Sequence, residues 1–165
     1  MIEFRPKETE DYKYKKELKE AFSDQYPPKT GSMRAGKEYH NPSAEEETCK
    51  RKAFKGVAWI KYWQYLSGNN SNPLKCTFCG EDIFVNVENA DALTFRMENK
   101  EKLTDASDVQ AIGGHLHLNG IDDSDGYMIV PMCKLCNAKS SDEALTVKES
   151  NMFVEEIGAT VEKDN

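Results

Sequence analysis

The chain has 165 residues, of which 38% are hydrophobic and 31% are charged. This length allows one ordinary domain, or a small domain with a helical extension, and no apolar run approaches the roughly 18 residues of a membrane-spanning helix. The N-terminus lacks the apolar stretch of a signal peptide, so we expect a cytoplasmic protein with no membrane partner. In that compartment paired cysteines bind metals more often than they form disulfides.

The net charge of −7 is unevenly distributed along the chain. Residues 1–80 carry 15 basic and 11 acidic side chains, a net charge of +4, whereas residues 81–165 carry 7 basic and 18 acidic ones, a net charge of −11. Proteins bind duplex DNA mostly through cationic contacts to phosphate, so the acidic half would be repelled by it. A protein partner is therefore favoured over nucleic acid, which only the first half could contact.

Two helices are predicted in the first half. The first covers residues 7–23, and the segment 25–41, which contains Pro27-Pro28, reads as a loop or linker. A capping box at Ser43 predicts the start of a second helix, which should end near Gly68. Its basic side chains are most simply a solvated face, but they are also the surface we predict for any phosphate contact: Lys50, Arg51, Lys52, Lys55 and Lys61.

An aromatic stripe marks the second half of this predicted helix. Trp59, Tyr62, Trp63 and Leu66 recur at the spacing of one helix face, which predicts a core face packed on the rest of the domain. A platform for stacking nucleic-acid bases is the alternative interpretation. Cys49, also in this region, is interpreted as an ordinary helix thiol.

Beyond Gly80 the hydrophobic period changes from helical to alternating, which predicts strands. We expect short strands at 83–87, 93–97, 115–118 and 127–131, and a final strand pair at 144–147 and 152–154. The acidic segment 122–125 reads as a solvated turn, because it lacks the glutamate that closes a calcium loop. Helices followed by strands indicate an α+β fold.

The most informative motif is a pair of Cys-x-x-Cys sequences, Cys76 with Cys79 and Cys133 with Cys136. A two-residue spacer lets both sulfurs of a pair reach one ion from a single tight turn, so four thiolates form a tetrahedral site. A structural Zn²⁺ is the predicted occupant. A rubredoxin-like iron centre is the alternative, although Asn137 stands where such a turn favours glycine.

The segment of about residues 74–141 resembles the treble-clef core of the HNH endonuclease superfamily. The resemblance lies in the order Cys76-x-x-Cys79, then Gly114-His115-Leu116, then Ile129-Val130-Pro131-Met132-Cys133-x-x-Cys136-Asn137. It implies a ββα-like zinc module in which a hairpin carries a histidine base and the next helix binds a second, catalytic ion such as Mg²⁺. His115 would be that base and Asn137 that ligand.

Two positions depart from the family pattern. Gly114 replaces the acidic residue before the hairpin histidine, and Met128 stands near the place of the middle Asn or His. A hydrolytic site that lacks two of its groups loses most of its rate, because such groups act as a unit. The competing interpretations are structural: His115 and His117 pack or cap the zinc sulfurs, and Asn137 caps the following helix.

We therefore predict an α+β protein with a helical region at 1–72 and a four-cysteine treble-clef zinc module with short strands at 73–165, together one compact unit. The predicted function is a degenerate HNH-like protein that binds a macromolecular partner, with protein favoured over nucleic acid. The alternative is an active metal-dependent nuclease of the HNH type, acting on DNA or RNA phosphodiesters.

Overall fold

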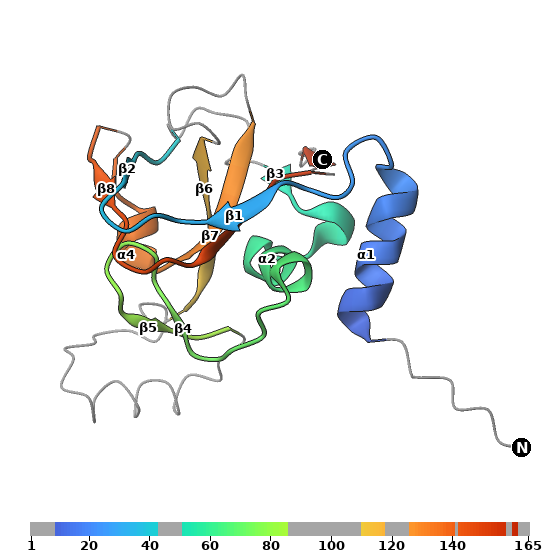
Figure 1. Cartoon of the computed structure of the whole chain (residues 1–165), viewed down its shortest axis with the longest axis horizontal. Helices are drawn as coiled ribbons and strands as arrows, with labels where there is room; N and C mark the ends of the chain where they lie inside the picture. The colour runs from blue at the N-terminus through green and yellow to red at the C-terminus, as the bar shows by residue number, and fades with distance from the viewer. Residues whose placement is uncertain are drawn as a thin grey trace, which may run out of the picture.

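The fold is built on a four-stranded antiparallel sheet (Figure 1). The computed structural model describes residues 9–42, 51–85, 110–117, 126–140, 142–157 and 160–161. The strand order is β1-β9-β7-β6, where the four strands are β1 (Thr30–Ser32), β6 (Ile112–His117), β7 (Tyr127–Met132) and β9 (Met152–Glu155). The mixture of helices and strands confirms the predicted α+β class.

The β6–β7 hairpin is the longest pairing in the sheet, with Ile112 opposite Met132 and His117 opposite Tyr127. Its two strands confirm the predicted strands at 115–118 and 127–131, with β6 beginning earlier than expected. All six residues of β7 are buried, because β9 pairs with it on the other side and both faces are covered. A strand buried on both faces is apolar throughout and does not alternate.

Both strands predicted at 144–147 and 152–154 are present, but the prediction that they pair with each other is wrong. β8 (Leu145–Thr146) pairs with β2 (Glu38–Tyr39), whereas β9 joins the main sheet between β7 and β1. The predicted loop at 25–41 therefore contains two strands, β1 and β2. Neither shows an apolar alternation over more than a residue or two, so only the tertiary pairing reveals them.

Helix α1 (Glu10–Ala21) lies inside the range predicted for the first helix. The Thr9 hydroxyl accepts a hydrogen bond from the Tyr12 amide at 3.3 Å, and acidic residues fill the first turn, as the helix dipole favours. The helix packs through Tyr14 and Leu18, its two buried residues. Tyr14 donates a hydrogen bond to the Phe54 carbonyl at 3.0 Å, which ties α1 to the segment before α2.

The second predicted helix is shorter than expected. Helix α2 covers only Trp59–Ser67, and it follows β3 (Arg51–Lys52) and a short 3-10 helix, η2 (Phe54–Gly56). The chain cannot continue as an α-helix here, because Lys55 and Gly56 have left-handed φ values of 63° and 72°. The predicted capping box at Ser43 lies outside the described residues.

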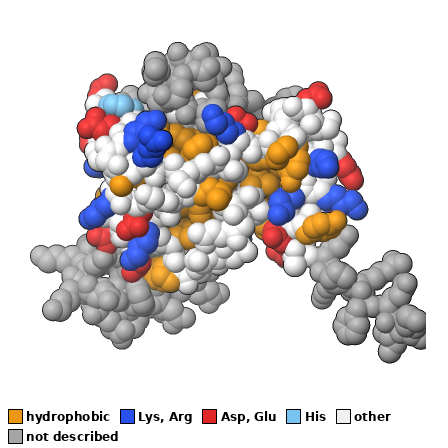
Figure 2. Space-filling model, viewed as in Figure 1, with side chains coloured by type: hydrophobic (Ala, Val, Ile, Leu, Met, Phe, Trp, Pro, Cys, Tyr) orange, Lys and Arg blue, Asp and Glu red, His pale blue; other side chains and the backbone are white. Residues whose placement is uncertain are grey.

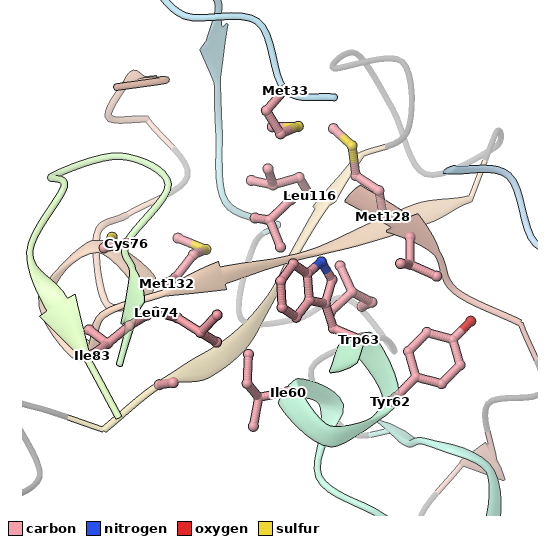
Figure 3. Close-up of a cluster of buried hydrophobic side chains, with 14 of the residues drawn as sticks. Met33, Ile60, Tyr62, Trp63, Leu74, Cys76, Ile83, Leu116, Met128 and Met132 are labelled. Carbon is pink, nitrogen blue, oxygen red and sulfur yellow. The ribbon is translucent and has the colours of Figure 1, made fainter. Parts of the chain in front are cut away.

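Helix α2 packs its aromatic side chains on the sheet, which confirms the predicted core face. Tyr62 and Trp63 are completely buried, and the Trp63 indole donates to the Met152 carbonyl at 2.8 Å. Figure 3 shows Ile60, Tyr62 and Trp63 on one side of the sheet and Met33, Leu116 and Met128 on the other. The sheet therefore separates two apolar layers.

Two further ribbons complete the described fold. β4 (Leu74–Lys75) pairs with β5 (Asp82–Ile83), and β10 (Thr160–Val161) pairs with β3. Of the predicted strand 83–87, only Ile83 lies in β5, and Phe84 forms an isolated bridge with Gln110. Residues 86–87 lie outside the described residues, as does the predicted strand 93–97. None of the helices in the described ranges is long and apolar enough to span a bilayer.

Candidate metal centre

The first cysteine pair lies in the tight turn between β4 and β5. The Gly80 amide donates to the Cys76 carbonyl at 3.0 Å, and the Cys76 amide donates to the Glu81 carbonyl at 2.8 Å. Gly80 has φ +74°, a left-handed value that glycine adopts without strain. The turn therefore folds back on itself, so that both sulfurs of the pair face the same side.

The second pair lies where β7 ends and the short helix α4 (Lys134–Asn137) begins. Cys133 is the N-cap of α4, and its sulfur accepts a hydrogen bond from the Cys136 amide at 3.4 Å. The Cys133 amide in turn donates to the Cys76 sulfur at 3.3 Å. Amide donors of this kind favour the thiolate form, which is the form that binds metals.

The four sulfurs converge on one point. The Sγ atoms of Cys76, Cys79, Cys133 and Cys136 all lie within 4.8 Å of one another, and three of the four residues are buried. The Cys79 and Cys133 sulfurs are 3.6 Å apart, far beyond the ~2.05 Å of a disulfide. A zinc tetrathiolate with bonds of about 2.3 Å places its sulfurs about 3.8 Å apart. The cluster therefore has the donor set and the dimensions of a four-coordinate metal site.

The thiol pKa values point to the same conclusion. Hydrogen bonds from the neighbouring thiols lower the pKa of Cys76, and hydrogen bonds within the cluster raise the pKa values of Cys79 and Cys136. The physical cause is that four sulfurs this close cannot all ionise without a cation between them. A bound divalent ion removes that conflict and leaves all four as thiolates.

Thr77, the residue after Cys76, fixes the first turn to the sheet. Its hydroxyl donates to the Pro131 carbonyl of β7 at 2.8 Å, and its amide donates to the same carbonyl at 3.0 Å. The Asn151 side chain donates to the Thr77 hydroxyl at 3.1 Å. Sequence reasoning missed this role, because a threonine between two cysteines carries no signal of its own.

Asn41 supports the second turn in the same way. Its side-chain amide nitrogen donates to the carbonyls of Cys136 and Lys139, each at 2.9 Å, and to that of Asn137 at 3.3 Å. These carbonyls lie at and just beyond the C-terminal end of α4, where helices leave acceptors unsatisfied. Asn41 lies 95 residues before Cys136 in a segment predicted as a loop, so nothing in the sequence connects the two.

His115 lies on the sheet face that packs against α2, and it does not contact the cysteines. Its ring meets the Trp59 ring edge-on at 4.7 Å, and its Nε2 lies 3.0 Å from Glu156 Oε2. This distance permits a charge interaction, although the geometry is not that of a hydrogen bond. The Glu156 side chain is 3% exposed and the His115 side chain 11%, so the contact is largely shielded from solvent. His117 packs on Tyr127 on the same face, with ring centroids 5.2 Å apart.

Asn137 lies against the opposite face of the hairpin. A Cβ atom added at Gly114 would be 3.2 Å from Asn137 Oδ1, and Gly114 faces away from His115 because neighbouring strand residues point to opposite faces. Asn137 is the last residue of α4, and Cys133, not Asn137, caps its start, which corrects the predicted capping role. The structure therefore does not bring His115 and Asn137 together. The polar residues of 119–125 lie outside the described residues.

Gly114 has no space for the acidic residue that the HNH pattern would place there. An added Cβ would lie 2.0 Å from Met132 Sδ and 2.9 Å from Met132 Cγ. Met132 is completely buried, so its side chain has little freedom to move aside. The glycine is thus part of the packing between the hairpin and the metal centre.

The predicted basic surface is divided among several elements. Arg51 and Lys52 form β3 and Lys61 lies on α2, while the Lys55 ammonium forms a salt bridge with Glu17 of α1. Lys50 lies outside the described residues. The described members of this set therefore do not share one helix face, and whether they contact nucleic acid stays a prediction.

In comparisons with family models, with curated proteins and with solved structures, nothing matches this chain. The site is therefore defined by its own geometry, as four cysteines placed to hold one metal ion.

Proposed function

We propose that this chain is a zinc-stabilised, HNH-like treble-clef protein that binds a macromolecular partner and does not hydrolyse phosphodiesters. The proposed treble clef consists of the Cys76–Cys79 turn, the β6–β7 hairpin and helix α4. Zn²⁺ is the occupant we propose, since tetrathiolate sites in such modules are structural.

The observation that carries this proposal is the separation of His115 from Asn137. A metal-dependent hydrolytic site needs its base and its metal ligands around one reacting atom, within about 3 Å. Here the two residues lie on opposite faces of the hairpin, and Glu156 and Trp59 enclose His115. A largely shielded histidine between an aromatic ring and a carboxylate serves packing and orientation well.

The closed coordination shell supports the same proposal. With four thiolates bound, Zn²⁺ has no open position for water or substrate. The ion would connect the β4–β5 turn to the end of β7, and thereby hold the hairpin and α4 in place. Its chemical contribution is folding free energy, because the four thiolates form a complete site only when the two turns have come together.

The negative charge of the second half and an exposed apolar side chain favour a protein as the binding partner. Residues 81–165 carry the net charge of −11, which is unsuited to DNA. In α4, Leu135 lies between two of the cysteines and is 73% exposed, one of three large hydrophobic side chains that are exposed among the described residues. An apolar side chain held on a rigid, metal-fixed turn is well placed to enter a pocket of a partner.

The first test is a plasmid-nicking assay with zinc-loaded protein in Mg²⁺ and in Mn²⁺, with the His115→Ala variant in parallel. We expect no cleavage by either protein. Cleavage by the wild-type chain that disappears in His115→Ala would refute the proposal and establish the nuclease.

One contact favours that alternative. The Glu156 carboxylate beside His115 resembles the pairing by which a carboxylate orients a histidine base. An active enzyme would then use His115 to activate water, with a second divalent ion such as Mg²⁺ and Asn137 as one of its ligands. The nicking assay separates the two functions, because only the enzyme requires His115 for turnover.

The second test addresses the partner. Zinc-loaded protein is used to capture interacting proteins from a cell lysate, and the Leu135→Ser and Lys134→Ser variants are compared with the wild-type chain by quantitative mass spectrometry. Both side chains are exposed on α4, so neither change should affect folding. A specific partner should be lost with Leu135→Ser and kept with Lys134→Ser. Equal capture by all three proteins would exclude this surface.

A further inference from the structure

Helix α1 lies at the opposite end of the described fold from α4 and the β4–β5 turn (Figure 1). An open pocket lies beside this helix. Its volume is about 380 Å³. Five side chains line it, four from the helix and one from the turn that follows: Tyr12, Lys15, Lys16, Lys19 and Tyr26. We refer to these five residues as the α1 pocket.

The helix face that lines the α1 pocket is not the face by which α1 packs on the rest of the protein. Positions 12, 15, 16 and 19 have the spacing of one helical face, whereas the buried residues Tyr14 and Leu18 lie on another. Tyr14 packs on Phe54 and Tyr65, with ring centroids 5.7 and 4.9 Å apart. The four helix side chains in the pocket can therefore be changed without removing the buried residues by which α1 packs, whereas Tyr26 also packs against the core.

The charge of the pocket is positive. Three lysines line it and no acidic residue does. The nearby Asp11 carboxylate accepts a hydrogen bond from the Thr9 hydroxyl, which lowers the pKa of that carboxyl, and the Lys15 ammonium lowers it further. Glu17, also on α1, forms its salt bridge with Lys55. Three ammonium groups in one small concavity favour an anion with several charged oxygens.

Two tyrosine rings lie beside these lysines. Tyr12 is 54% exposed, and Tyr26 is half-buried in the turn after the helix. Figure 2 shows lysine or arginine side chains and hydrophobic side chains next to one another over α1. A single exposed aromatic residue needs no explanation. Two rings in one pocket with three lysines are the combination that binds a planar group joined to phosphate.

We propose that the α1 pocket binds a nucleotide, with its phosphates on the three lysines and its base against Tyr12. The volume is at the lower end of the range of about 300–1,000 Å³ for ligand sites, which suits one nucleotide unit and not a duplex. An acidic peptide would satisfy the lysines but would leave the rings without a stacking partner. The nucleotide is either free or part of a single strand, and the proposal is independent of the zinc site.

The experiment uses the full zinc-loaded chain and two probes, a fluorescein-labelled oligothymidylate of 15 nucleotides and ATP. Binding of the oligonucleotide is followed by fluorescence anisotropy between 50 and 300 mM salt, and ATP is added as competitor. Three contacts to a single strand predict that log K falls with log salt with a slope of about −2. Amide chemical shifts of both complexes should change within residues 12–26.

Matched variants distinguish the pocket from net charge. Changing Lys15, Lys16 and Lys19 together to Gln should weaken binding at least tenfold, whereas changing Lys13, Lys134 and Lys139 to Gln, which removes the same charge, should have less than a twofold effect. All three control lysines are exposed and outside the pocket. Tyr12→Ala should weaken binding about tenfold, and Tyr12→Phe should bind normally, because stacking needs the ring and not the hydroxyl.

Competition identifies the source of the nucleotide. Displacement of the oligonucleotide by ATP at similar concentration supports a free nucleotide, and binding of the oligonucleotide without displacement supports a single strand. The proposal is overturned if neither probe binds, if both triple variants lose affinity equally, or if Tyr12→Ala has no effect. Equal displacement by a 15-residue polyglutamate would also overturn it, and would assign the pocket to an acidic protein.

Discussion

Replacement of Gly114 should reveal how tightly the hairpin packs on the metal centre. In Gly114→Ala the new methyl group would lie 2.0 Å from Met132 Sδ, so Met132 must leave its position. Gly114 does not have a left-handed φ, so alanine suits the backbone and the cost is one of packing. Overpacking of this kind costs about 1–3 kcal/mol, and we expect about 2 kcal/mol, or roughly 4–8 °C in melting temperature.

A double-mutant cycle with Met132→Ala tests that reasoning. Met132 is completely buried, so truncation alone should cost about 3 kcal/mol through the cavity that it leaves. In the double variant the methyl group added at position 114 occupies part of that cavity, and we expect a total loss of about 3 kcal/mol where additivity would give about 5. The assay is urea unfolding at constant zinc concentration, because bound metal itself adds stability.

Gly113→Ala is the matched control for this cycle. A Cβ there would lie 2.4 Å from the Trp59 carbonyl carbon, a backbone atom at the start of α2, on the other face of the hairpin. It should be strongly destabilising, and Met132→Ala should give no relief. If Gly114→Ala were neutral, or if the Gly114–Met132 pair were additive, the packing that excludes an acidic residue at position 114 would be refuted.

Three further predictions concern side chains that are largely or fully buried. Asn41→Asp should destabilise the protein more than Asn41→Ala, by about 3 against about 2 kcal/mol in urea unfolding, because a carboxylate cannot donate to the carbonyls of Cys136, Asn137 and Lys139. The reverse order would contradict the role of Asn41 as a hydrogen-bond donor to these carbonyls. Tyr62→Phe should cost about 2 kcal/mol of unfolding free energy in the same assay. The Ile157 amide donates to the Tyr62 hydroxyl at 3.0 Å and would lose its acceptor. An unchanged stability would show that another acceptor takes the place of the hydroxyl. Burial raises the pKa values of Tyr14 and Tyr62 above 10.0, so above pH 10 these tyrosines ionise first in the unfolded chain. The two groups should therefore leave the free energy of unfolding independent of pH below pH 10. Above pH 10 each should lower it by up to about 1.4 kcal/mol per pH unit. Circular dichroism melts from pH 9 to 11.5 measure this slope, which should be shallower in Tyr14→Phe; an identical slope would contradict it.

The cysteine motif was predictable because its spacing is itself a geometric constraint. Two-residue spacers require each pair to share a turn, and the structure brings all four sulfurs together as expected. The two strands of the β6–β7 hairpin and the core face of α2 were also predictable, since short apolar runs and apolar periodicity report burial directly. Zinc as the occupant and the treble clef as the specific fold stay predictions.

The remaining features depend on contacts between distant segments. β1 and β2 are strands only because β9 and β8 pair with them, and their sequences carry no strand pattern. The start of α2 depends on the left-handed backbone at Lys55, which a capping box at Ser43 does not reveal. The face on which His115 lies, and its proximity to Glu156, follow from the order of strands in the sheet. The sequence motif shows that the histidine is close to the cysteines along the chain, but it does not determine on which face of the strand the histidine side chain lies.

The central claim is that a metal held by four cysteines maintains this fold, and its most direct test combines metal analysis with thermal unfolding. We predict one zinc ion per purified chain, and loss of the cooperative melting transition both after EDTA treatment and in Cys133→Ser. The Cys49→Ser variant, which changes a cysteine outside the two motifs, should melt like the wild-type chain. A metal-free chain that keeps the same melting transition, or an unchanged transition in Cys133→Ser, would contradict the claim, and a red protein containing iron would assign the site to electron transfer.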